Sequence, residues 1–573
     1  MGALGSSGRS APSARTISST QARVGDLAVG QGGQPAEGVA VCLSERPFAR
    51  VHTSDYGTVV VYPHARPGTP GWLGFGRMTD PVLHLLRTRP DLAELAAFPF
   101  NFDVERVYHV EDVRLASGAP LEPIAGDDTG GTYFLCACAA VLHASSEGEA
   151  VLMADGVGEA LEMLVRLPDW CEGLTTDLDE DGMIAAVRAS DDEAREEFAP
   201  ELDAQREALL SGLGLPRRPL VELFAMAESA AGRTDPHHVL LNARDLCAYR
   251  LDESYHLSLR DIVLGPGREA LGRVRAGAPG ARDAAAGDAV LRAGVLWAAY
   301  EDRRDDDLPL LRFLLEREVV GREVPEREEA VGAEGYETRW LAAVLVASYG
   351  RDEDAQLLRS ATSAATGGGG GAVDWARVQE AERFGPAAQS PFTWVELARR
   401  QGRIEHARAA LIRLLDDTGP DAGRLRKLSR ALERVGDHAQ AARAQVYLLS
   451  LQDSAWDRAS EAYVLARVER GRGDLAAAAR ALHRARTAVG VEGGAPDDTV
   501  AQWHRRGLGR LITEQHLELV LAAVEAGDAD LARTTMAHGR YLLDRIGAES
   551  AKTLSGLSTR AKWAVAGLRR GGA

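Results

Sequence analysis

The sequence predicts a multidomain protein in which an N-terminal α+β unit is followed by all-α helical repeats. Two segments rich in β-branched and aromatic residues, 56–62 and 132–136, lie in the first quarter of the chain. Beyond residue 200 the apolar residues recur with helical spacing, and near the C-terminus a glycine–alanine pattern repeats four times. At 573 residues, the chain is long enough for about two to four domains.

The N-terminal segment changes character near residue 40. Residues 1–40 are rich in Ser, Gly, Ala and Gln and contain few large apolar side chains, so we expect a disordered leader. They lack the apolar core of a secretory signal, which favours a cytoplasmic protein. Tyr56–Tyr62 is then expected to form a strand, and Thr79 to cap a helix that has Pro81 in its first turn.

Residues 41–175 are predicted to form the α+β domain. Thr132–Cys136 is expected to form a second strand, and Val141–Met153 a hairpin that turns at Ser146–Gly148. The next apolar residues follow the spacing of one helix face: Val157, Ala160, Leu161, Leu164 and Val165.

The formal net charge of −18 is concentrated in one part of the chain. Between Glu147 and Glu207 there are 19 Asp and Glu against 4 Arg and no Lys, a local balance of −15. Such a field repels phosphate backbones, so this region is not expected to bind nucleic acid. A solvated acidic face and a site for a basic partner both fit this charge, and residues 176–215 are expected to form an acidic helical connector.

Residues 216–366 form the next predicted helical region. Helical structure with short polar or Gly/Pro breaks is expected over four segments: Leu209–Ala231, Ala284–Tyr300, Leu308–Val319 and Thr338–Tyr349. Residues 265–288 are rich in Gly and Pro and are expected to form a mobile connection. The five glycines Gly367–Gly371 predict a flexible linker and a domain boundary.

Residues 372–573 carry an internal repeat. Gly402, Gly436, Gly473 and Gly527 are each followed, five residues later, by an alanine, and the last three also by Asp at the next position. The glycine spacings are 34, 37 and 54 residues, and a loop insertion over Val489–Asp498 is expected to account for the last. A period of about 34 residues is that of the tetratricopeptide repeat, which the pattern resembles and which stacks helix hairpins into an extended surface. Small residues seven positions before two glycines, Ser429 and Ala466, fit the close approach of two helices.

Several short motifs suggest chemistry, and each has a simpler structural interpretation. Asp128-Thr129-Gly130 matches the aspartic-protease triplet, but its glycine-rich flank favours a turn before a strand. Residues 177–188 resemble an EF-hand loop with Arg188 in place of the final Glu, so an acidic solvated loop is favoured over calcium binding. His237 and His238 are adjacent and cannot share a helix face. The sequence therefore predicts no catalytic, cofactor or metal site.

The five cysteines form no C-x-x-C pair. Cys136 and Cys138 lie two apart on the predicted strand and so share one face. Small buried apolar side chains are favoured over a metal or redox pair.

Residues 120–170 resemble the second half of SUKH superfamily domains. The similarity is carried by Pro123–Leu135 (PIAGDDTGGTYFL) and by Glu159–Val165 (EALEMLV). The resemblance implies an antiparallel sheet with helices and a bacterial immunity or interaction protein that binds toxins without catalysis. The family's usual opening helix is not evident in the sequence.

These observations predict a non-enzymatic, cytoplasmic protein-binding protein, with no membrane or nucleic-acid partner. Asp127, Asp128, Glu147 and Glu149 are the predicted partner-binding residues, and a basic toxin is the expected partner because opposite charge speeds association. A helical-repeat scaffold in which the SUKH-like domain is a docking module, and an enzyme of unrecognised type, are the alternatives. Oligomeric state stays open.

Overall fold

The computed structural model describes residues 80–137, 139–167, 179–256, 258–320, 333–362, 370–385, 389–490, 503 and 507–568. The expected leader, the expected strand Tyr56–Tyr62, Thr79 and Cys138 lie outside these residues. The first described elements are the helices α1 (Pro81–Thr88) and α2 (Pro90–Ala97). Asp80 is the N-cap of α1, because its carboxylate accepts from the Val82 and Leu83 amides.

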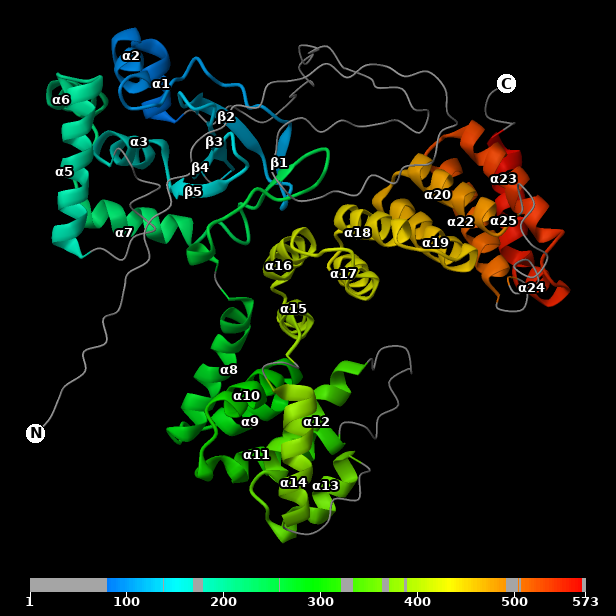
Figure 1. The fold of residues 1–573 in the computed structure, drawn as a ribbon. Helices are drawn as coiled ribbons and strands as arrows, with labels where there is room; N and C mark the ends of the chain where they lie inside the picture. Colours follow the sequence, from blue (N-terminus) through cyan, green and yellow to red (C-terminus); the bar gives the residue numbers. More distant parts are fainter. Residues whose placement is uncertain are drawn as a thin grey trace, which may run out of the picture. The chain divides into compact units, whose positions relative to one another are not determined.

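The N-terminal part is built on a four-stranded antiparallel sheet in the order β2-β3-β4-β5 (Figure 1). Its strands are β2 (Leu121–Gly126), β3 (Thr132–Cys136), β4 (Val141–Ala144) and β5 (Ala150–Ala154). The expected strand at 132–136 and the expected hairpin through Ser146–Gly148 are confirmed.

Both faces of the sheet are covered, which explains why β3 is buried at every position. Tyr133 and Leu135 belong to one core cluster, which also contains residues of α1, α2 and α3 (Val157–Arg166). Phe134 and Cys136 alternate onto the opposite face and belong to a second cluster, together with Leu115, Leu240 and Tyr249. The sheet is therefore the middle layer of this part of the molecule.

The second layer is a two-stranded ribbon made from distant segments. β1 (Val113–Leu115) pairs antiparallel with β6 (Leu240–Asn242), and Val113 lies opposite Asn242. The loop after β6 makes hydrogen bonds with two of the C-terminal helices, α16 (Ile404–Asp416) and α18 (His438–Ser450).

The acidic segment is helical and not the loop expected over residues 177–188. α5 (Glu180–Glu197) begins after Asp179, whose side chain accepts from the Gly182 amide. The acidic residues of this motif therefore form a helix N-terminus, where carboxylates are favoured by the helix dipole. Part of the acidity is internally paired, since Arg206 donates to Asp191 at 2.6 and 3.0 Å.

The segment Leu209–Ala231, expected to be helical, contains a break. Two helices, α6 (Leu202–Leu213) and α7 (Leu220–Ala231), are separated where Gly214 takes a left-handed conformation and Pro216 and Pro219 follow.

The middle helices share one core, which contains residues from both sides of Gly367–Gly371. Their bounds are α8 (Leu259–Arg275), α9 (Ala281–Gly287), α10 (Ala289–Glu301), α11 (Leu308–Val320), α12 (Ala333–Ala347), α13 (Ala355–Thr362) and α14 (Gly370–Gln379), which a π-helical turn at Glu380–Phe384 continues. Single-turn 3-10 segments lie at Glu253–Tyr255, Asp305–Asp307 and Asp352–Asp354.

Two expectations for this region differ from the structure. Residues 265–288 are largely helical, and Gly267 of α8 packs against the Gly294 backbone of α10 so closely that a Cβ would clash. Ala372, Ala376 and Phe384 share a core cluster with residues of α8–α13, so Gly367–Gly371 does not separate two cores. Gly267 and Gly294 allow two helices to pack closely. Composition alone does not distinguish such glycines from those of a flexible linker.

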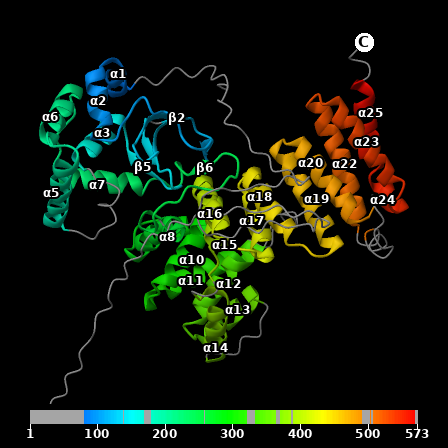
Figure 2. The same ribbon diagram turned by 45° about the horizontal axis from the view of Figure 1, so that its top comes forward.

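The C-terminal helices form successive hairpins (Figures 1 and 2). The helices are α15 (Pro391–Arg400), α16 (Ile404–Asp416), α17 (Ala422–Arg434), α18 (His438–Ser450), α19 (Ala455–Arg472), α20 (Leu475–Ala488), α22 (Leu508–Glu525), α23 (Ala529–Leu543), α24 (Ala548–Thr553) and α25 (Ser555–Leu568). The insertion expected over 489–498 lies almost entirely outside the described residues.

Each repeat glycine lies at the turn of a hairpin. Gly402, Gly436, Gly473 and Gly527 all have positive φ, between 74° and 88°. The alanine five residues after each glycine is buried and at most 1% exposed. A larger side chain at these alanines would hold the two helices apart, and the glycine allows the chain to reverse.

The aspartates after three of the glycines are N-caps. Asp437, Asp474 and Asp528 each accept a hydrogen bond from the amide three residues later, at 2.8 to 3.0 Å. Ser429 of α17 is 2% exposed and donates to the Ala441 carbonyl of α18 at 3.3 Å, and Ala466 is also buried. The expected close approach of the paired helices is confirmed for these two positions.

Candidate functional site

One end of the sheet gathers the predicted binding residues. The β2–β3 turn carries Asp127 and Asp128, and the β4–β5 turn carries Glu147 and Glu149. Ser146 Oγ donates to the Thr129 carbonyl at 3.0 Å, which joins the two turns.

Asp127 differs from the other three because its carboxylate is buried and fully engaged. The residue is 8% exposed. Its Oδ1 accepts from the Thr129 amide at 3.0 Å, the Thr129 hydroxyl at 2.8 Å and the Gly131 amide at 2.7 Å. Its Oδ2 lies 2.9 Å from His143 Nε2. Asp127 therefore closes the turn and holds it on β4, and its side chain is not presented at the surface.

The electrostatics of this pair agree with that role. Burial alone would raise the pKa of Asp127, but hydrogen bonds from His143 and Thr129, together with the charge of His143, lower it to about 2. The ring of His143 stacks on Tyr133 with centroids 4.9 Å apart.

Asp128, Glu147 and Glu149 are exposed on the two turns. Glu149 forms an ion pair with exposed Arg250 at 3.3 Å, so its negative charge is partly neutralised. Asp128 and Glu147 present the acidic charge that a partner would meet first.

A loop that the sequence analysis missed lies beside these turns. Asp103 exchanges both backbone hydrogen bonds with Gly126, at 2.9 and 3.0 Å, and Arg106 donates to the Asp127 carbonyl at 3.2 Å. The loop exposes three large apolar side chains: Val107 at 44%, Tyr108 at 69% and Val110 at 54%. The run Val107–Val110 has the composition of a strand, so no signal in the sequence indicates that it is exposed.

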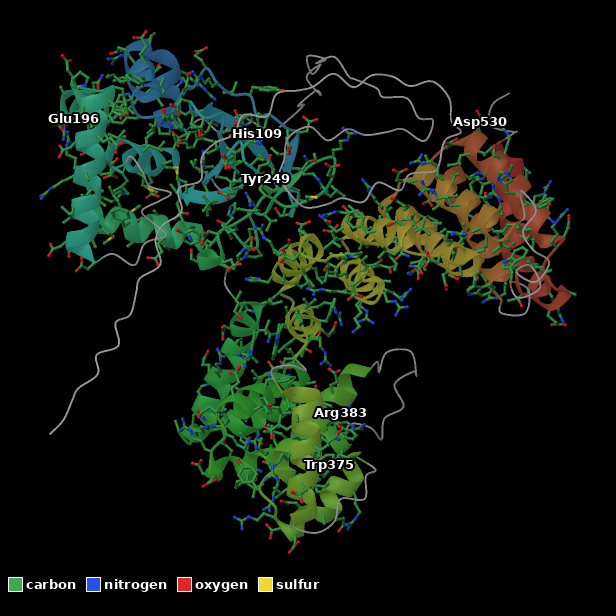
Figure 3. The ribbon with its side chains drawn as sticks, viewed as in Figure 1. His109, Glu196, Tyr249, Trp375, Arg383 and Asp530 are labelled. Atoms are coloured by element: carbon green, nitrogen blue, oxygen red, sulfur yellow. The ribbon has the colours of Figure 1, made fainter. Side chains whose placement is uncertain are left out.

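His109 fixes this loop from beneath. It is 8% exposed, its Nδ1 lies 3.0 Å from Thr132 Oγ1, and its Nε2 lies 2.8 Å from the Tyr249 hydroxyl. Figure 3 shows His109 and Tyr249 beside one another. The Tyr249 hydroxyl also donates to Glu111 at 3.3 Å. Because that hydroxyl has one proton, Nε2 of His109 carries the ring proton and Nδ1 accepts from Thr132.

This buried network sets the charge states around the loop. Burial lowers the pKa of His109, so the ring is neutral at neutral pH. Burial, and then the charge of Glu111, raise the pKa of Tyr249. This neutral, hydrogen-bonded histidine ties the loop to the sheet next to Tyr108.

The other sequence motifs occupy structural positions. A second Asp-Thr-Gly triplet is present at Asp417–Gly419, where Asp417 is the C-cap residue of α16 and exposed. Among the described residues no hydrogen bond joins Asp417 to Asp128. These two carboxylates therefore do not form the proton-sharing pair of an aspartic protease in this structure.

The histidine and cysteine candidates are also placed. His238 Nδ1 lies 3.4 Å from the Arg233 carbonyl, and the rings of His237 and His406 meet edge to face. Cys136 is a buried free thiol. No group of three or more metal-ligating side chains occurs in the described part of the chain.

Comparison with known proteins gives no family to which the chain can be joined. No protein-family model, no curated protein and no solved structure matches it. Within the described ranges, none of the helices combines the length and apolar character needed to span a bilayer.

Proposed function

We propose that this chain is a non-enzymatic protein-binding protein that captures a basic partner, such as a toxin, at the end of its N-terminal sheet. The proposal includes a SUKH-like identity for the α+β part and a tetratricopeptide-like solenoid for the C-terminal hairpins. We name the proposed surface the acidic-apolar surface and define it by Val107, Tyr108, Val110, Asp128, Glu147 and Glu149.

The exposed side chain of Tyr108 is the observation that carries the proposal. A tyrosine that is 69% exposed, close in the chain to two exposed valines, contributes to an exposed apolar patch of the kind that marks interaction sites. Tyrosine is among the residues that contribute most to binding energy, because it buries a large ring with few rotors and keeps a polar hydroxyl. The His109 anchor orders the loop before binding, so less entropy is lost on association.

The acidic rim selects the charge of the partner. Asp128 and Glu147 lie on the two turns next to this loop, and neither forms an ion pair within the described part of the chain. Carboxylates placed around an apolar centre accelerate association with a basic protein surface and disfavour association with an acidic one. This is the chemistry by which a binding protein would block a cationic, nucleic-acid-directed toxin.

The test compares full-length baits that differ at this surface. Wild type, Tyr108→Ala and the double variant Asp128→Lys/Glu147→Lys would be used to capture proteins from host lysate, with quantitative mass spectrometry as readout. Glu196→Lys, an exposed carboxylate on α5, is the matched charge control (Figure 3). Far-UV circular dichroism checks that each variant is folded.

The expected result is one basic protein that wild type and Glu196→Lys retain and the two surface variants lose. With that partner purified, Tyr108→Ala should weaken binding by about 30-fold, and the lysine pair should slow association by about tenfold and reduce its salt dependence. A partner held equally by all four baits would place the binding site elsewhere and refute the proposal.

A second candidate function is that of a scaffold or regulator in which the N-terminal part is a docking module. The observation that favours it is the set of contacts between the loop after β6 and helices α16 and α18. Retention of a partner by all the surface variants, and its loss when those helices are altered, would favour this function.

A further inference from the structure

The ribbon β1–β6 rests on α16 through a small apolar contact. Val239 and Leu241 form one buried cluster with Ala409 and Ile412 of α16. The segment that follows the ribbon, Leu246–Tyr249, continues across α16 onto α18.

Most polar contacts of this segment with α16 and α18 are made to its backbone, and Cys247 Sγ adds a side-chain contact 3.1 Å from Arg443 Nη2. The Leu246 carbonyl accepts from Gln440 Nε2 at 2.7 Å and from Arg443 Nη1 at 3.0 Å. The Ala248 amide donates to Asp416 Oδ2 at 2.9 Å. The carbonyl of the next residue, Tyr249, accepts a hydrogen bond from Arg413.

The side chains that make these contacts are buried or ion-paired with the segment in place. Gln440 is fully buried, and the side chain of Arg443 is 9% exposed. Arg443 and Asp416 form an ion pair at 2.5 Å, and Arg413 pairs with Asp235 at 3.0 Å. A fixed carboxylate between two fixed guanidinium groups therefore presents an acceptor flanked by donors.

This pattern recognises a peptide backbone and not a particular side chain. A carbonyl, an amide two residues later and a carbonyl one residue beyond that are features of any chain in this conformation. Leu246 reaches its position with φ of +61°, a left-handed conformation that turns its carbonyl toward α18. At the centre the segment carries the small side chain of Ala248, so close approach to α16 is possible.

We propose that the face formed by Arg413, Asp416, Gln440 and Arg443 is a docking site for a peptide hairpin, and that Leu246–Tyr249, which pairs with β6, occupies it in cis. The partner it fits is a protein segment with a small residue at the position of Ala248. A tethered segment has an effective concentration in the millimolar range, so a free peptide binds only when the cis segment is released. This inference concerns other residues and another partner than those of the acidic-apolar surface.

The first test uses a labelled synthetic peptide of residues 238–251 carrying Cys247→Ser. In the full-length chain, Ala248→Pro removes the amide that donates to Asp416 and leaves the docking face intact. Fluorescence anisotropy should show binding to Ala248→Pro that is at least tenfold tighter than binding to wild type. Adding Gln440→Ala and Arg443→Ala to Ala248→Pro should abolish it, whereas adding Arg430→Ala, an exposed arginine of α17, should not.

A second test does not depend on the folding of the proline variant. Arg443 Nη2 lies 3.1 Å from Cys247 Sγ, so docking shields this thiol. Gln440→Ala removes a contact to Leu246 and a 3.3 Å contact to Arg443, and should speed alkylation of Cys247 by about tenfold, measured by mass spectrometry. Equal peptide affinity for wild type and Ala248→Pro, or an unchanged alkylation rate in Gln440→Ala, would overturn the proposal.

Discussion

His516 should make the C-terminal helices lose stability as the pH falls below about 6.5. The residue lies on α22 and is 1% exposed. Its Nδ1 donates to the Ile512 carbonyl at 2.8 Å, and its Nε2 accepts from Arg486 at 2.7 Å. His483 and Arg486 face it from α20 and His538 from α23, around a pocket of about 280 Å³.

Burial, followed by the charges of Arg486 and His538, lowers the pKa of His516 to about 3, against 6.5 in the unfolded chain. The unfolded state therefore binds more protons between those two values, and stability must fall as the pH falls. At pH 5 the unfolded histidine is almost fully protonated and the folded one is neutral, which corresponds to about 2 kcal/mol.

The assay is urea unfolding at pH 7.5 and pH 5, with hydrogen exchange of the α22 amides as a local readout. His516→Gln removes the titrating group. The free energy of unfolding of this variant should therefore fall less between pH 7.5 and pH 5 than that of wild type, by about 2 kcal/mol. His84→Gln, an exposed histidine of α1, should behave as wild type. Equal pH dependence in wild type and His516→Gln would refute the assignment of a neutral, buried His516.

Two further predictions concern stability. Asp127→Ala should destabilise the N-terminal part by about 2–3 kcal/mol in urea unfolding, because it leaves His143 and the Gly131 amide unsatisfied, whereas its exposed neighbour Asp128→Ala should stay within about 0.5 kcal/mol. The contribution of Asp127 should fade as pH drops from about 4 to about 2, since its folded pKa lies below the unfolded one. Asp474→Ala and Asp528→Ala should each cost about 1 kcal/mol, and the matching Asn variants much less; equal losses for Ala and Asn would contradict the capping role.

The hairpins could be predicted because their determinants are local. A glycine that reverses the chain, an aspartate that caps the next helix and an alanine at the helix contact all lie within six residues, as in Gly436, Asp437 and Ala441. The strand Thr132–Cys136 and the hairpin after it were predictable for the same reason, since β-branched and aromatic runs beside turn residues depend on nearest neighbours.

Other features could not be predicted because identical residues serve different contacts. Gly267 and Gly294 sit inside helices because two backbones meet there, and a composition rich in glycine gives the same signal as a linker. Asp179 has the spacing of a calcium ligand but caps α5. Of the four predicted binding carboxylates, Asp127 is the one with buried hydrogen-bond partners, which adjacent Asp128 lacks. Burial of one neighbour and exposure of the other depends on His143, which lies on a different strand.

Tyr249 physically joins the two surfaces proposed for this chain. Its hydroxyl contacts His109, which anchors the loop that exposes Tyr108, and its carbonyl accepts from Arg413 on α16. Release of the docked segment would withdraw the hydroxyl from His109 and leave a buried ring nitrogen without its partner, at a cost of about 1–3 kcal/mol. By reciprocity, ordering of the loop and docking of the segment favour one another by the same coupling free energy. A partner on the acidic-apolar surface would therefore keep the α16–α18 face closed, and a peptide on that face would weaken the hold on such a partner.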